Sequence, residues 1–394
     1  MVPIIYDILL ILMLFILYRC GKNIAKTKKL LSPAFIIAII SYTLNEGLRF
    51  GRGIDYNLYG SAFESLERGG ESNWDFSFLY IAKILIEIGI PWQGYVVLMS
   101  FVFILAAIIL LRNFREVLPY ALPLFVLFSI SETENMVRWY LGFSFIMIGL
   151  GYLFGEKRQN AIFFLFSLLA CTFHIALFPL VLAFYLLHLF KKPLFSPLWT
   201  LALYFAIAFV FQTDFMLPLV GMVNILSGTS ERFANYGNQA EYWLTSGYAG
   251  RENFSALPNL QELIFYCFLV WLGYKAIREM DKKYIFVYNA FLVGLLFNPL
   301  ALQIELFKRF NQPFMFFCGI VLACVLKQVF VTKTVRVKHF ILLCSLLVFV
   351  NMGRKILAVP FKSHPDKFLY VWNSKGKSYK AMYDMWIDEM LKND

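Results

Sequence analysis

Residues 95–111 read YVVLMSFVFILAAIILL, seventeen residues in a row without a charge. A helix needs about 20 mainly apolar residues to cross the hydrocarbon core of a bilayer. Similar uncharged runs occupy residues 139–154, 198–213 and 312–326. Inside lipid every backbone polar group must be bonded within the protein, so such runs form helices or closed barrels. The sequence shows no alternation of apolar and polar residues with a period of two, which favours helices.

The composition of the whole chain agrees with these runs. Of 394 residues, 60% are hydrophobic and only 15% are charged, whereas soluble domains carry about 25% charged residues. A net charge of +11 would suit a nucleic-acid partner, but the basic residues lie in short loops between apolar runs, as in cytoplasmic loops of membrane proteins. We therefore predict no nucleic-acid partner. The six cysteines show no metal or redox spacing and are expected to be core residues.

The charge pattern predicts an all-α integral membrane protein with about twelve transmembrane helices. Six short basic loops are placed in the cytoplasm, and the N-terminus and the tail at 354–394 lie outside. Residues 1–353 form the transmembrane domain, with external segments at 49–94 and 214–258. The predicted spans are 3–18, 31–48, 95–111, 118–131, 138–154, 160–173, 175–190, 197–213, 259–276, 284–302, 310–327 and 339–353.

Residues 74–90 are apolar enough to resemble a further span. Tyr80, Lys83 and Glu87 share one helical stripe within this segment. We therefore predict an amphipathic helix that lies on the outer membrane surface.

Ionisable residues gather on one side of this predicted topology. Arg49 and Arg52 follow the second span, Arg138 opens the fifth, and Arg309 precedes the eleventh. Ionisable residues at membrane depth are costly and are functional candidates, although a charge at a helix end can also reach the interface and do nothing more. Guanidinium groups match phosphate and pyrophosphate oxygens bidentately, so the cluster predicts an anionic ligand. The carboxylates expected nearby are Asp55, Glu132 and Glu305.

Four short motifs carry a resemblance to a known family. They are RFGRGIDYNLY (49–59), NMVRW (135–139), FHIAL (173–177) and KRFNQPF (308–314). Over residues 30–330 the chain resembles the EpsG/Wzy family of bacterial polysaccharide polymerases. Arg49, Asp55 and Tyr56 match the first family pattern, while Trp139 stands where the second pattern usually has Gln.

The resemblance implies a glycosyltransferase of the bacterial cytoplasmic membrane, GT-C-like in general character, with its active site on the outer face. Such enzymes transfer a glycan chain from undecaprenyl pyrophosphate to a sugar hydroxyl of another lipid-linked unit, and often work with a chain-length regulator. Arg49, Arg52, Arg138 and Arg309 would stabilise the leaving pyrophosphate, with Tyr56 and Glu132 also binding substrate. Asp55 or Glu305 would be the base, with His174 as the second choice. No metal or other cofactor is expected.

Two other classes remain open at this point. A GT-C enzyme that uses a lipid-monophosphate sugar, or an O-acyltransferase, would differ in its donor. A lipid-linked oligosaccharide flippase would show transport without elongation, although such transporters usually have internal repeats and sites near the midplane. Aromatic residues of the external loop (Tyr236, Tyr242, Trp243 and Tyr248) would stack on sugars or form an interfacial belt.

Overall fold

The computed structural model describes residues 2–155, 159–210, 260–302, 305–331, 369–374, 376 and 378–392. The chain divides into two compact units. The first comprises residues 1–189 and 318–386, and the second comprises residues 190–317 and 387–394.

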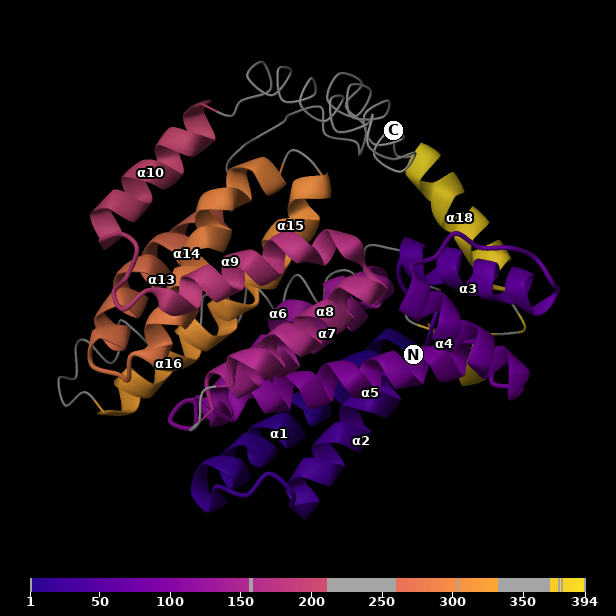
Figure 1. Cartoon of the computed structure of the whole chain (residues 1–394), viewed down its shortest axis with the longest axis horizontal. Helices are drawn as coiled ribbons and strands as arrows, with labels where there is room; N and C mark the ends of the chain where they lie inside the picture. Colours follow the sequence, from indigo (N-terminus) through magenta and orange to yellow (C-terminus); the bar gives the residue numbers. More distant parts are fainter. Residues whose placement is uncertain are drawn as a thin grey trace. The chain divides into compact units, whose positions relative to one another are not determined.

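The first unit is built from antiparallel and crossing apolar helices. The helix α1 packs against α2 and α6, α2 against α5, α5 against α7, and α7 against α8; α1 and α2 are the indigo pair of Figure 1. The uncharged run quoted above lies in α5, whose buried face includes Tyr95, Phe103 and Ile108. The bounds are α1 (Val2–Thr27), α2 (Pro33–Gly47), α5 (Trp92–Leu111), α6 (Leu118–Asn135), α7 (Val137–Leu153), α8 (Asn160–Phe173), η1 (Ile175–Leu177), α9 (Phe178–Leu189) and α16 (Phe317–Val331).

The described residues contain several apolar helices. Five of them are long and apolar enough to cross a membrane: Ile5–Thr27, Trp92–Leu111, Leu260–Arg278, Lys283–Ala301 and Phe307–Gln328. Shorter apolar helices occupy Val137–Leu153, Asn160–Phe173, Ile175–Leu189 and Pro197–Val210. These helices coincide with predicted spans and confirm a helical membrane protein. The count of twelve crossings and the GT-C-like character stay predictions, and both the span at 339–353 and the whole loop at 214–258 lie outside the described residues.

The first helix extends beyond residue 18, where the predicted first span ends. The helix α1 continues to Thr27, through the residues that were assigned to a basic loop. Its buried stripe of Met13, Leu17, Cys20 and Ile24 repeats every three or four residues and continues past the first basic residue, Arg19, so the packed face of the helix is not interrupted. Basic side chains on the opposite face do not end a helix, because they can extend toward water.

The segment between α2 and α5 contains two helices. The predicted amphipathic helix is α4 (Phe76–Glu87), and its polar stripe of Tyr80, Lys83 and Glu87 is exposed while Phe78 and Leu85 are buried. Its position on the membrane surface stays a prediction. The helix α3 (Ile54–Glu67) was not predicted, because its low hydrophobicity and its Gly-rich start are typical of a loop.

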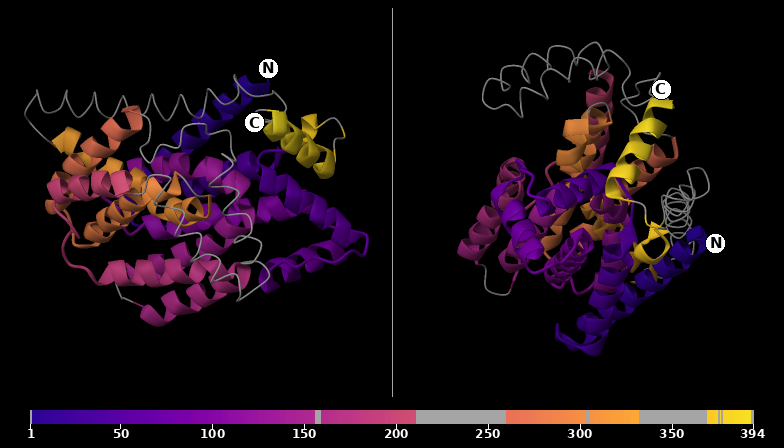
Figure 2. Two further views of the ribbon diagram at one scale, coloured as in Figure 1. Left: turned by 90° about the horizontal axis from the view of Figure 1, so that it is seen from above. Right: turned by 90° about the vertical axis from the view of Figure 1, so that its right-hand side faces the viewer.

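The C-terminal segment returns to the start of α3. The strand β2 (Leu369–Tyr370) pairs antiparallel with β1 (Arg49–Phe50), with Tyr370 opposite Arg49. This short ribbon is an exception to the all-α prediction. The chain continues through η3 (Val371–Asn373) into α18 (Tyr379–Lys392). Figure 2 shows this yellow segment beside the purple helices of the first unit, where Met382 is fully buried against Phe50.

The second unit contains the helices α10, α13, α14 and α15. The helix α14 (Lys283–Ala301) packs against α10 (Pro197–Val210), α13 (Leu260–Arg278) and α15 (Glu305–Met315). Asn289 in α14 is fully buried and bonds the connection before α10, because its amide accepts from Leu194 N at 2.9 Å and donates to Lys192 O at 3.1 Å.

Because β1 and β2 are paired, residues 48–54 and the C-terminal segment must lie on the same side of the membrane. We expect Glu67→Cys and Asp384→Cys, both at exposed positions, to react with an impermeant maleimide from that one side. The measurement uses a variant whose native cysteines are replaced by alanine. Lys29→Cys, across the predicted second span, serves as the opposite-side control. Labelling of positions 67 and 384 from opposite sides would refute the strand pairing.

Candidate functional site

The site begins where α2 ends and the chain turns sharply into α3. Gly51 and Gly53 have φ values of 74° and 90°, in the left-handed region that glycine enters without strain. Gly53 also lies against the end of α6, since a Cβ placed there would be 2.8 Å from Asn135 Cα. This turn therefore presses the Arg49–Arg52 segment onto the last turn of α6.

Arg52 is enclosed by two carboxylates and two tyrosine rings. Its side chain is 3% exposed, and its Nη1 donates to Glu134 Oε1 at 2.5 Å and lies 3.9 Å from Glu46 Oε1. Its Cζ lies 4.7 Å from the ring centroid of Tyr6 and 4.9 Å from that of Tyr370. A cation over an aromatic face is attracted by the electron-rich face of the ring quadrupole. We call Glu46, Arg49, Arg52, Glu134 and Tyr370 the arginine cluster.

Arg49 bonds the carboxyl-terminal ends of two helices. Its Nη1 donates to Glu46 O of α2 at 2.5 Å, and its Nη2 lies 3.4 Å from Thr133 O and 3.5 Å from Glu134 O of α6. The last carbonyls of a helix have no partner within it and carry partial negative charge. Arg49 therefore ties α2 to α6 as well as contributing a charge to the cluster.

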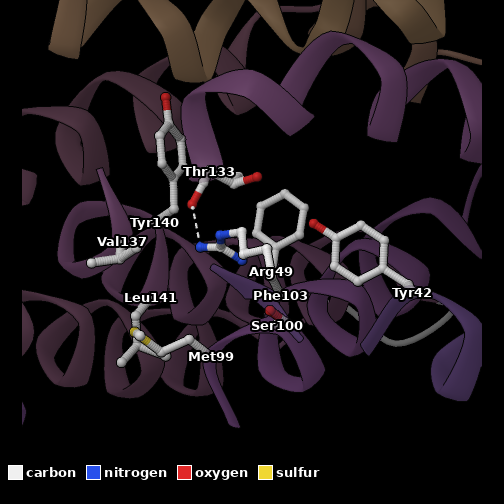
Figure 3. A pocket seen from close by; sticks show the side chains of 9 residues that line it. All are labelled: Tyr42, Arg49, Met99, Ser100, Phe103, Thr133, Val137, Tyr140 and Leu141. Atoms are coloured by element: carbon white, nitrogen blue, oxygen red, sulfur yellow. Dashed lines mark hydrogen bonds between the residues drawn. The ribbon is translucent and has the colours of Figure 1, made fainter. Parts of the chain in front are cut away.

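A small cavity lies beside Arg49 (Figure 3). It has a volume of about 20 Å³, enough for about one water molecule. Arg49 projects between the side chains that line it, and the dashed line in Figure 3 marks its bond to Thr133. The lining residues are Tyr42, Arg49, Met99, Ser100, Phe103, Thr133, Val137, Tyr140 and Leu141.

Several donors of the arginine cluster are enclosed but unused. Arg49 Nε, Arg52 Nε and Arg52 Nη2 have no hydrogen-bond partner within the described part of the chain. An enclosed donor without a partner costs about 1–3 kcal/mol. The Nε and Nη2 hydrogens of one guanidinium point the same way and form a fork that matches two oxygens of a carboxylate or phosphate. The Nε and Nη2 groups of Arg52 thus have no hydrogen-bond partner among the described residues, while Glu134 bonds Nη1 and the Tyr370 hydroxyl also interacts with the guanidinium.

Two tyrosines of the C-terminal segment stay protonated at neutral pH. Burial raises the pKa of Tyr370 to about 12, with the Glu46 charge adding to the rise and the Arg52 charge opposing it. Burial likewise raises the pKa of Tyr379 to about 12. The Tyr370 hydroxyl donates to Asn45 Oδ1 at 2.8 Å and the Tyr379 hydroxyl to Gln93 Oε1 at 3.2 Å. Both hydroxyls therefore act as neutral donors that attach the segment to α2 and α5.

The start of α7 joins two of the sequence motifs. Arg138 Nη1 lies 3.0 Å from Asp75 Oδ2, and its Cζ lies 5.4 Å from the ring centroid of Tyr59. The next residue, Trp139, meets the His174 ring edge-on at 4.9 Å. The NMVRW and FHIAL motifs are therefore in contact through their aromatic residues.

The structure brings together part of the predicted site. Arg49 and Arg52 lie in the cluster; the Tyr56 hydroxyl donates to Arg49 O at 3.0 Å, and Asp55 N donates to Asn135 Oδ1 at 3.1 Å. Glu132 is half-buried in α6, but Glu134 rather than Glu132 bonds Arg52. Arg309 belongs to the second unit, so its convergence with the other arginines stays a prediction. The side chain of Glu305 and the aromatic residues of the external loop lie outside the described residues.

Sequence reasoning noted Glu134 at the end of the predicted fourth span without assigning it to the site, and it missed Tyr6, Gln93 and Tyr370 in and around the arginine cluster. Glu134 follows the fully packed Ile130 by four positions, and this spacing places both on the same face of α6. That signal was available in the sequence. Tyr6, Gln93 and Tyr370 had no such signal, because their link to the motif is made only by packing. The described residues contain no group of three or more His, Cys, Asp or Glu side chains that would hold a metal ion.

Comparison with known protein families matches the EpsG family over residues 32–363. The chain belongs to the EpsG family. The matched region of this EpsG-family protein contains Glu46, Arg49, Arg52 and Glu134, but ends before Tyr370. Comparisons with curated proteins and with solved structures found no match. Family membership and the apolar helices together support a membrane-bound polysaccharide polymerase of the glycosyltransferase type.

Proposed function

We propose that this EpsG-family protein polymerises lipid-linked oligosaccharide units on the outer face of the bacterial cytoplasmic membrane. The donor is a glycan chain on undecaprenyl pyrophosphate, and the acceptor is a sugar hydroxyl of a second lipid-linked unit. The acceptor oxygen forms a bond to the anomeric carbon as the bond from that carbon to the pyrophosphate oxygen breaks. Negative charge then develops on the departing lipid pyrophosphate.

The observation that carries this proposal is the Nε/Nη2 edge of Arg52, whose two donors have no hydrogen-bond partner in the part of the chain that the structure describes. A fork aimed at two oxygens suits a phosphate group, and a buried site strengthens its interaction with developing charge. Arg49, three residues before Arg52, adds a second cation. Its side chain lines the small cavity, and its Nε has no hydrogen-bond partner among the described residues. Arg138 remains partly accessible, with 14% of its side chain exposed, and supplies a further contact for the same ligand.

Asp55 is our choice for the base that takes the acceptor proton. It lies in the first turn of α3 and is half-buried, unlike the enclosed Glu46. Its backbone N–H is fixed to Asn135, so the start of α3 keeps a set position against α6, next to the arginine cluster. A carboxylate within hydrogen-bond reach of a hydroxyl can accept its proton during attack. His174 and Glu305 remain the alternatives.

Deletion of the gene followed by analysis of surface glycans tests the proposed function. We expect single oligosaccharide units to accumulate on the lipid pyrophosphate while long polymer disappears, and the wild-type gene to restore the polymer. Normal polymer with one decoration missing would instead identify an acyl- or side-branch transferase. Units that accumulate only on the inner face would identify a flippase. Either of these results would overturn the polymerase proposal.

A further inference from the structure

We propose that Tyr370, from the C-terminal segment, is a positioning residue that orients the guanidinium of Arg52 for the substrate. This inference rests on the proposed function, because it assumes that the free fork of Arg52 contacts the leaving pyrophosphate. It goes beyond that function by assigning a role to a part of the chain that lies after the family match at residues 32–363.

The C-terminal segment is held against the turn between α2 and α3 at several points. Tyr370 pairs with Arg49 in the β ribbon, and Val371 N donates to Leu48 O at 3.1 Å. Met382 is fully buried over Gly51, where a Cβ would lie only 2.4 Å from Met382 Cε. These contacts do not involve the Arg52 side chain, so the segment has its own attachment to the turn.

Tyr379 adds an aromatic anchor to the same attachment. Its ring lies 5.2 Å from that of Phe50 and 5.8 Å from that of Tyr56, and its hydroxyl bonds Gln93. Tyr379 therefore contributes to fixing the segment without placing a ring on Arg52.

Tyr370 is the residue through which the C-terminal segment contacts the Arg52 side chain. It is 1% exposed, its hydroxyl bonds Asn45 of α2, and its ring lies under the Arg52 Cζ at 4.9 Å. The Tyr370 ring also stacks on the Trp372 ring, with the two centroids 4.5 Å apart and an interplanar angle of 7°. The ring therefore has little freedom to turn.

The fixed Tyr370 ring limits the directions in which the Nε and Nη2 groups of Arg52 can point. Glu134 bonds Nη1 of Arg52. The guanidinium can then be misaligned with the substrate mainly by rotation about the bonds of the Arg52 side chain. Tyr6 and Tyr370 restrict this rotation through their ring contacts. Because small errors in placement at a reacting centre cost up to about 100-fold in rate, removal of one ring should lower the rate of the chemical step more than it weakens binding.

Elongation by the purified full chain in lipid vesicles, with an undecaprenyl-pyrophosphate oligosaccharide as donor, tests this proposal. We compare Tyr370→Leu, which removes the ring, with Tyr370→Phe, which keeps it. For Tyr370→Leu we expect kcat to fall about 10- to 100-fold with a smaller change in the KM for donor. Tyr370→Phe should keep kcat within about threefold of the wild type, because the ring contact remains.

Tyr379→Leu is the matched control, because it loosens the same segment from Phe50 and Gln93 without removing the ring on Arg52. We expect a lower Tm but a nearly unchanged kcat per folded molecule. If Tyr370→Leu and Tyr379→Leu lose activity only in proportion to folded protein, the segment is merely structural and the positioning role is wrong. A folded wild type that forms no polymer from this donor would overturn the proposed function itself.

Discussion

Arg52→Lys is expected to remain folded and yet to lose about 100-fold in the rate of polymer elongation. Lysine keeps a positive charge beside Glu134 and Glu46, but its ammonium group has no planar fork. Loss of one donor to developing charge in a buried site typically lowers kcat by about 10²–10³-fold. The measurement is elongation from a lipid-pyrophosphate donor, normalised to the folded protein.

Arg52→Ala should give a different result, because it removes the charge as well as the fork. Two enclosed carboxylates then lose their cation, which typically destabilises a protein by about 3–5 kcal/mol. Combining Arg52→Ala with Glu134→Gln should recover part of that stability, measured by thermal unfolding in detergent, but no polymer. Normal polymer from Arg52→Lys would show that the fork is not used, and the pyrophosphate role would fail.

Gly53→Ala is expected to cost more than about 3 kcal/mol of stability and to abolish polymer formation. Its φ of 90° strains any L side chain, at about 1–3 kcal/mol. The new Cβ would also lie 2.8 Å from Asn135 Cα and 3.1 Å from Glu134 O. Both are backbone atoms at the end of α6, so they cannot turn away as a flexible side chain would. The turn that carries Arg52 must then separate from Glu134.

Gly69→Ala is the matched control for this prediction. Its φ of 86° imposes a similar backbone strain, but nothing lies within 4 Å of the added Cβ. We expect a loss of about 1 kcal/mol and normal polymer. Equal losses of stability for Gly53→Ala and Gly69→Ala would show that the contact between the turn and α6 contributes little.

The sequence located the motifs better than it located the contacts between them. Asp55 and Arg52 belong to one short motif, so their proximity follows from the chain itself. Glu134 is 82 residues from Arg52 and Tyr370 is 325 residues from Asn45, yet both pairs are hydrogen-bonded. No periodic pattern links such positions, because their contact depends on how α2, α6 and the C-terminal segment pack.

The amino-acid sequence is sufficient to identify a helical membrane protein of the EpsG family. Long uncharged runs leave few alternatives, because backbone groups in lipid must be bonded locally. It also identifies Arg49, Arg52 and Arg138 as charged residues near the membrane whose burial is energetically unfavourable unless they are paired. The partners of these arginines are known only from the packing of the chain, with Glu134 and Tyr370 at Arg52 and Asp75 at Arg138. Helix formation depends on neighbours along the chain, whereas the surroundings of a buried side chain depend on segments that packing brings together.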